Sequence, residues 1–159
     1  MVLNRLMLLD VVQIIFQQHQ QVLLGLRQNT GVFDQLWVFP SWRVEAGEKL
    51  IDAAVREAME EVGVRPLRLE LLLRIKDAAS ARFHQVYLCT AWAGTLHNDE
   101  PHLCRELRWF ERHTAPVGCT PVTYAIWPAM NAAWPAGSAN CISAASGWRV
   151  MHKKRRARG

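Results

Sequence analysis

The chain of 159 residues lacks the features that would place it outside the ordinary globular class. It has only 9 glycines and 7 prolines, and half of its residues are hydrophobic, which excludes collagen-like, coiled-coil and largely disordered chains. No apolar run reaches the roughly 18 residues that span a bilayer, and no small-residue cleavage site follows the apolar N-terminus. We therefore expect a cytoplasmic protein that does not enter a membrane.

Cysteine is scarce and scattered. The four cysteines, at positions 89, 104, 119 and 141, form no C-x-x-C pair, so the sequence offers no zinc or disulfide framework. We interpret them as the reduced thiols of an intracellular protein.

Positive charge in excess is confined to one end of the chain. The formal net charge is +5, and five of the 19 basic residues lie within 153–159, so the rest of the chain balances its 14 acidic residues. We interpret 136–159 as a poorly ordered extension that ends in a solvated basic tail. The alternatives for this tail are a nucleic-acid contact and an address signal.

Residues 1–135 have the length of one domain and combine strand and helix patterns. The strand patterns cover 11–16, 22–26, 37–39, 67–75, 82–93 and 105–110. The first two runs are separated by 17–21, which predicts a hairpin. Helical spacing of apolar residues covers 49–62, and Thr120-Pro121 predicts a capped helix through about Ala133. This order predicts an α/β fold with a mixed sheet between helices.

The helix at 49–62 has an apolar face and an acidic one. Its apolar positions are Ile51, Ala54, Val55, Ala58 and Val62. Gly63 stands where a helix end favours a left-handed residue. Glu57, Glu60 and Glu61 share a side roughly 120° round from the apolar face, because a helix repeats every 3.6 residues.

Three glutamates gathered in this way repel one another. They form either a solvated acidic face or a site for a hard divalent cation, for which carboxylate oxygens are the preferred ligands. Arg56 can reach Asp52 one turn earlier on the helix, or Glu48 folded in from the preceding loop. Gly47 supplies a tight turn before Glu48.

The segment 42–64 resembles the Nudix box, G-x5-E-x7-R-E-U-x-E-E-x-G-U, where U is aliphatic. Its fixed positions are occupied by Glu48, Arg56, Glu57, Glu60, Glu61, Gly63 and Val64, with Ala58 at the first aliphatic position. Further likeness to MutT-like members lies at 23–27 and 100–110, so the resemblance covers about 10–134. It implies the Nudix α/β/α sandwich and a metal-dependent hydrolase of diphosphates.

The box departs from its pattern at the first position, where Trp42 replaces glycine. Tryptophan adopts positive φ only at a cost. We therefore expect one of two outcomes: the ring points outward and activity survives in reduced form, or the loop is distorted and Glu48 is misplaced. The second outcome would leave a catalytically impaired module that binds a nucleotide or, through the basic tail, RNA.

The resemblance also implies roles for the charged residues of the box. Glu57, Glu60 and Glu61 would bind Mg²⁺, with Glu48 as a further contributor and Mn²⁺ as a substitute ion. Arg56 would orient the site. The attacking water would be activated by Glu60 or Glu61.

Further roles fall outside the box. An acid from a later loop, Glu100 or Glu106, is the alternative for activating the water. Arg27 matches a phosphate-contacting arginine, and Trp37 could stack on a base, although a surface arginine and a core aromatic are the plainer readings. By analogy, the small size favours a (d)NTP or oxidised (d)NTP, cleaved to the monophosphate and pyrophosphate.

Overall fold

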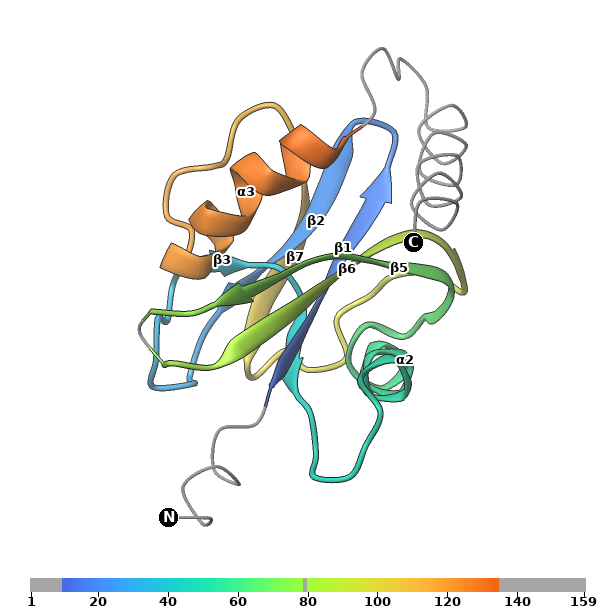
Figure 1. The fold of residues 1–159 in the computed structure, drawn as a ribbon. Helices are drawn as coiled ribbons and strands as arrows, with labels where there is room; N and C mark the ends of the chain where they lie inside the picture. The colour runs from blue at the N-terminus through green and yellow to red at the C-terminus, as the bar shows by residue number, and fades with distance from the viewer. Residues whose placement is uncertain (1–9, 79, 135–159) are drawn as a thin grey trace.

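The computed structural model describes residues 10–78 and 80–134 of the chain (Figure 1). The extension expected over 136–159, its basic tail and residues 1–9 lie outside the described residues.

The described residues form a seven-stranded sheet and two helices. The strands are β1 (Val11–Gln18), β2 (Gln21–Arg27), β3 (Trp37–Val38), β4 (Ser41–Arg43), β5 (Arg65–Lys76), β6 (Phe83–Ala93) and β7 (Cys104–Glu111). The helices are α2 (Leu50–Val62) and α3 (Pro121–Ala133). Every element expected from the sequence is present, and the short strand β4 is an addition.

Strand β1 organises the sheet, because three strands pair with it. It runs parallel to β6, from Val11 opposite His84 to Phe16 opposite Cys89. It also pairs antiparallel with β4, and at its far end with β2, as the predicted hairpin requires. The other pairings are antiparallel: β5 with β6, and β3 and β7 with β2. The sheet is therefore mixed, as expected.

The two helices cover opposite faces of the sheet (Figure 1). Successive residues of a strand point to opposite faces. Ile14 and Phe16 of β1 accordingly pack in the core beneath α2, whereas Ile15 packs in the core beneath α3. This arrangement is the α/β/α sandwich that the sequence predicts.

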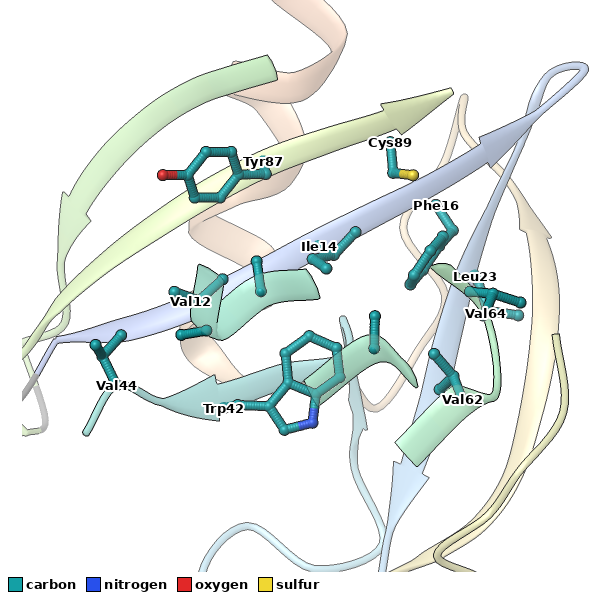
Figure 2. Packing of buried hydrophobic residues seen from close by; sticks show 13 residues of the cluster. Val12, Ile14, Phe16, Leu23, Trp42, Val44, Val62, Val64, Tyr87 and Cys89 are labelled. Carbon is teal, nitrogen blue, oxygen red and sulfur yellow. The ribbon is translucent and has the colours of Figure 1, made fainter. Parts of the chain in front are cut away.

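Helix α2 is turned slightly from the orientation that the sequence predicts. Ala53 is buried, whereas Ile51, which we placed on the apolar face, is 46% exposed. The buried residues of the helix are three alanines and Val62, and they share a core with Trp42 of β4 (Figure 2). Small side chains on this face leave room for the large indole.

The helix termini carry the predicted signals. Thr120 caps α3 by accepting a hydrogen bond from the backbone N–H of Thr123, and Pro121 follows at the first position. Gly63 ends α2 with φ 70°, a left-handed conformation. No helix in the described part of the chain is long and apolar enough to cross a bilayer.

Candidate active site

Arg56 of α2 gathers the acidic side chains of the helix and of the loop before it. Its Nε and Nη2 donate to Glu48 Oε2 and Oε1 at 2.9 and 3.0 Å. Its Nη1 donates to Glu57 Oε1 at 2.8 Å and to Glu60 Oε2 at 3.3 Å. Of the two partners that the sequence left open, the structure brings Glu48 to Arg56. The hydrogen bond from Arg56 holds the pKa of Glu48 below its ordinary value.

The loop before α2 turns as predicted. Gly47 has φ 80°, and the backbone N–H of Glu48 donates to the carbonyl of Glu45 at 3.1 Å. This turn delivers Glu48 to the guanidinium of Arg56, so the loop and the helix are joined by a bidentate ion pair.

Trp42 adopts neither of the two arrangements that the sequence suggested. It lies within β4, opposite Val12 of β1, and its φ is not positive. Its ring points inward and is only 6% exposed, among the side chains of the core beneath α2 (Figure 2). Glu48 nevertheless reaches Arg56. The strand backbone of β4 accommodates tryptophan without the conformational cost that a glycine-specific turn would impose.

The buried indole of Trp42 meets the last acid of the box. Its Nε1 donates a hydrogen bond to Oε2 of Glu61. The pKa of Glu61 is raised to about 7: burial is the largest cause, the nearby carboxylates of Glu100 and Glu57 add to it, and the bond from Trp42 opposes it. Glu57, Glu61 and Glu100 therefore form an acidic group, whose carboxylates repel one another when all three are ionised.

The loop that carries Glu100 is fixed to the end of α2. The backbone N–H of His97 donates to the carbonyl of Val62 at 3.1 Å, and that of Asp99 donates to the carbonyl of Glu61 at 2.9 Å. A Cβ at Gly63 would overlap the ring of His97. Gly63 is thus required both for its left-handed backbone and for the close approach of this loop.

Two cavities share Arg27 in their lining, and the acidic group borders the first of them. The first, of about 180 Å³, is lined by Arg27 of β2, Glu61 of α2 and Glu100. The second, of about 370 Å³, is lined by Phe33, Trp42 and a set of polar residues. That polar set includes Gln13, Arg27, Arg43, Arg82 and His84. Arg27 lines both cavities, so a ligand extending from one to the other would pass this guanidinium.

Of the two residues that the sequence suggested for substrate binding, Arg27 lines the cavities and Trp37 does not. Arg27 donates from Nε to the carbonyl of Val32 at 3.0 Å and from Nη2 to Thr30 Oγ1 at 3.1 Å, which leaves further N–H groups for a ligand. Trp37 is 9% exposed, packs edge-on against Phe110 with ring centroids 4.8 Å apart, and lies outside the lining of both cavities. The plainer reading of Trp37 as a core aromatic is therefore the one that the structure supports.

The two later acids also differ. Glu106 accepts both of its hydrogen bonds from Arg108, at 2.9 and 3.0 Å, and lies outside the lining of both cavities. Glu100 lies beside Glu61 in the first cavity. Arg43 and Arg82 of the second cavity were not predicted from the sequence, because a three-residue strand and a hairpin end show no periodicity that would reveal which way their side chains point.

The acidic group has the donor chemistry for a hard divalent cation, since it offers carboxylate oxygens alone. Within residues 10–78 and 80–134, no three His, Cys, Asp or Glu side chains are close enough together to hold a metal ion as they stand. Glu48 and Glu60 face Arg56, and Glu57 shares that partner. A cation would neutralise the repulsion among these carboxylates, which adds to the effect of burial on the pKa of Glu61, so the group fits such an ion.

Comparison with known proteins agrees with this geometry. The NUDIX domain family matches residues 8–128. The 8-oxo-dGTP diphosphatase of Buchnera aphidicola subsp. Schizaphis graminum is 31% identical over 93 residues, which are 58% of this chain and 71% of that protein. The crystal structure of the MutT NUDIX hydrolase from Burkholderia pseudomallei has a TM-score of 0.69 at 26% identity, covering 76% of this chain and 95% of that one.

The solution structure of the E. coli ORF135 protein shares the fold, with a TM-score of 0.68 at 24% identity over 81% of this chain and 92% of that one. The family match spans well over half of the chain and includes the acidic helix, its loop and Arg27. The chain therefore belongs to the NUDIX domain family, as a MutT-like Nudix hydrolase that acts on phosphoric anhydride bonds.

Proposed function

We propose that the chain is a Mg²⁺-dependent pyrophosphohydrolase that cleaves a (d)NTP or an oxidised (d)NTP to the nucleoside monophosphate and pyrophosphate. The observation that carries this proposal is the meeting of Glu57, Glu61 and Glu100 beside a cavity that Arg27 also lines. An acidic group and an arginine at one cavity suit a divalent cation and the phosphates of a nucleotide.

Glu57 and Glu61, with Glu100, would hold the Mg²⁺, and Mn²⁺ would serve as a substitute. Glu48 and Glu60 would join them only by sharing their oxygens with Arg56 or releasing it. A bound divalent cation neutralises charge that develops on the phosphates and lowers the pKa of an attacking water. Arg56 keeps Glu57 and Glu48 in place for that task.

Arg27 would bind a phosphate through the N–H groups that its loop contacts leave free, since a guanidinium matches phosphate with paired donors. Glu100 would accept the proton of the attacking water, with Glu61 as the alternative. Glu60 is a weaker candidate because its side chain is 58% exposed and bonded to Arg56. Glu106 is also a weaker candidate than Glu100, because it is paired with Arg108 and lies outside both cavities.

The base of the nucleotide would occupy the larger cavity. Its volume of about 370 Å³ falls within the usual range of about 300–1,000 Å³ for small-molecule sites. Phe33, which is 41% exposed, offers a face for stacking there, and Arg43 and Arg82 offer donors. The relative that acts as an 8-oxo-dGTP diphosphatase supports an oxidised guanine nucleotide as the first substrate to test.

The test is pyrophosphate and phosphate release with Mg²⁺, measured over canonical and oxidised (d)NTPs for the chain and for Trp42→Gly. We expect pyrophosphate release by the chain itself, abolished by a chelator. Turnover by Trp42→Gly alone would instead support the catalytically impaired binding module. Inactivity of both would refute the nucleotide assignment and direct the search to other diphosphates.

A further inference from the structure

We propose that Trp42 is a positioning residue for Glu61: its indole N–H fixes one oxygen of the carboxylate and holds the side chain ready for the cation. The inference rests on the proposed function, because that function gives Glu61 its cation. A glycine at this position has no side-chain donor, so the orientation is a property of this chain and not of the box pattern.

The indole is a rigid anchor. Its backbone is held in β4 by pairing with Val12 of β1, and its ring is 6% exposed within the core beneath α2 (Figure 2). Close-packed surroundings leave such a ring little freedom to rotate. The N–H therefore stands at a fixed point at the edge of the core, where Glu61 emerges from α2.

The pairing of groups is chemically specific. An indole N–H can only donate, and when buried it usually finds an acceptor. The acceptor here is Oε2 of Glu61. A carboxylate has about four lone-pair sites on its two oxygens, so accepting this bond leaves sites for a cation. A hydrogen-bond partner behind a metal ligand restricts the orientation of that ligand, and its loss commonly weakens metal binding by about 10–100-fold.

The first test is the affinity of the full chain for Mn²⁺, measured by calorimetry for wild type and Trp42→Phe. Phenylalanine keeps an aromatic ring in the core and removes the donor together with part of the ring volume. We expect the Kd for Mn²⁺ to rise about tenfold, the lower end of the range for such partners.

Trp127→Phe is the matched control. Trp127 is also buried, and its Nε1 donates to the carbonyl of Arg112 at 2.9 Å, but it lies in the core beneath α3. Its replacement removes one indole hydrogen bond from the other face of the sheet. The Kd for Mn²⁺ should stay within twofold of the wild-type value.

The second test needs neither metal nor turnover. In a ¹H–¹⁵N spectrum of the metal-free chain, the indole resonance that disappears in Trp42→Phe belongs to Trp42. We expect Glu61→Gln to shift this resonance, because an amide oxygen is a weaker acceptor than a carboxylate. Glu60→Gln should leave it in place, since Glu60 is bonded to Arg56.

The outcomes separate this inference from the proposed function. If the wild type binds Mn²⁺ and Trp42→Phe binds it equally well or more tightly, the positioning role alone is overturned. Tighter binding by Trp42→Phe would mean that the indole competes with the cation. Absence of any Mn²⁺ binding by the wild type would overturn both. If Trp42→Phe fails to fold, the contact is still refuted when none of the indole resonances of the chain shifts in Glu61→Gln.

Discussion

The two faces of the sheet are built by different means. On the α3 face, Ile126, Trp127 and Met130 are buried, and Trp127 stacks on Phe39 with ring centroids 5.7 Å apart. The helix also has a side-chain cap at Thr120. Packing and capping are strong enough here to tolerate Pro128 within the helix, where proline removes a backbone donor.

The α2 face contributes three alanines and Val62 to its core, and a tryptophan from β4 fills the space. Lys49 at the helix N-terminus makes no side-chain capping bond. The outer side of α2 is given to Arg56 and its carboxylates. The difference shows that α3 stabilises the sheet, whereas α2 holds charged groups in place and depends on an arginine and an indole to do so.

The largest difference between the faces should appear in turnover. Glu57→Gln removes a carboxylate from the acidic group, and we expect kcat/KM to fall about a thousandfold, equivalent to about 4 kcal/mol. The thermal midpoint of the metal-free chain should change little, because the substitution also removes repulsion. Pyrophosphate release and circular dichroism measure the two effects.

Glu106→Gln is the control for that loss, since Glu106 lies outside both cavities. Its kcat/KM should stay within twofold of wild type. A loss comparable to that of Glu57→Gln would show that the later acid was assigned wrongly between Glu100 and Glu106.

The free energy of unfolding, unlike turnover, should be more sensitive to substitution in α3 than in α2. Met130 of α3 is fully buried, and Met130→Ala should lower the free energy of unfolding by about 2–5 kcal/mol. Met59 of α2 is 52% exposed, and Met59→Ala should change it by less than about 0.5 kcal/mol. Urea denaturation measures both. Equal losses would mean that α2 is buried in solution by something beyond the sheet.

A smaller effect should appear in the pH dependence of the metal-free chain. The pKa of Glu61 rises from an ordinary 4.5 to about 7 because the group is buried, so the folded chain holds a proton that the unfolded chain has lost. Stability from this group therefore falls as the pH rises from about 4.5 to about 7. Glu61→Gln should gain stability relative to wild type over that interval, as measured by thermal unfolding.

Mg²⁺ should raise the midpoint of the wild type more at pH 8 than at pH 5, because it binds the ionised carboxylate. Thr120→Ala, on the α3 face, serves as the reference. Its thermal midpoint should differ from that of the wild type by a constant amount over the same pH interval. A difference in thermal midpoint between Glu61→Gln and wild type that does not change with pH would contradict the raised pKa of Glu61.

The smallest effects concern the helix caps. Thr120→Ala should cost about 1 kcal/mol of unfolding free energy, because the N–H of Thr123 loses its acceptor. Lys49→Ser should add up to about 1 kcal/mol by supplying the cap that α2 lacks. Denaturant titration of both variants checks the pair. A loss in Lys49→Ser would show that the lysine stabilises the helix in another way.

Most of the fold follows from local patterns in the sequence. The helical spacing of 49–62, the Thr120-Pro121 cap and the alternating strands each depend on neighbours in the chain, which a sequence displays directly. The face of α2 was harder, since Ile51 and Ala53 both fit a helical stripe. Only packing against the sheet selects the alanine.

The site was predictable as a set of residues and less so as a geometry. Spacing placed Glu57 and Glu61 on one side of α2. Charge offered both Asp52 and Glu48 as partners of Arg56, and only the structure chooses Glu48. The contact of Trp42 with Glu61 was missed because it depends on the pairing of β4 with β1, a long-range interaction. Trp37 could not be assigned from sequence, since core and stacking aromatics look alike there.

The parallel pairing of β1 with β6 has a consequence for folding kinetics. It closes a loop that runs from Val11 to His84, and this loop contains Arg27, β4 and the whole of α2. Closure of so long a loop is entropically costly and slows folding. We therefore expect Arg27 and the acidic helix to be brought together late in folding, so recovery of activity during refolding should follow the same time course as formation of the sheet.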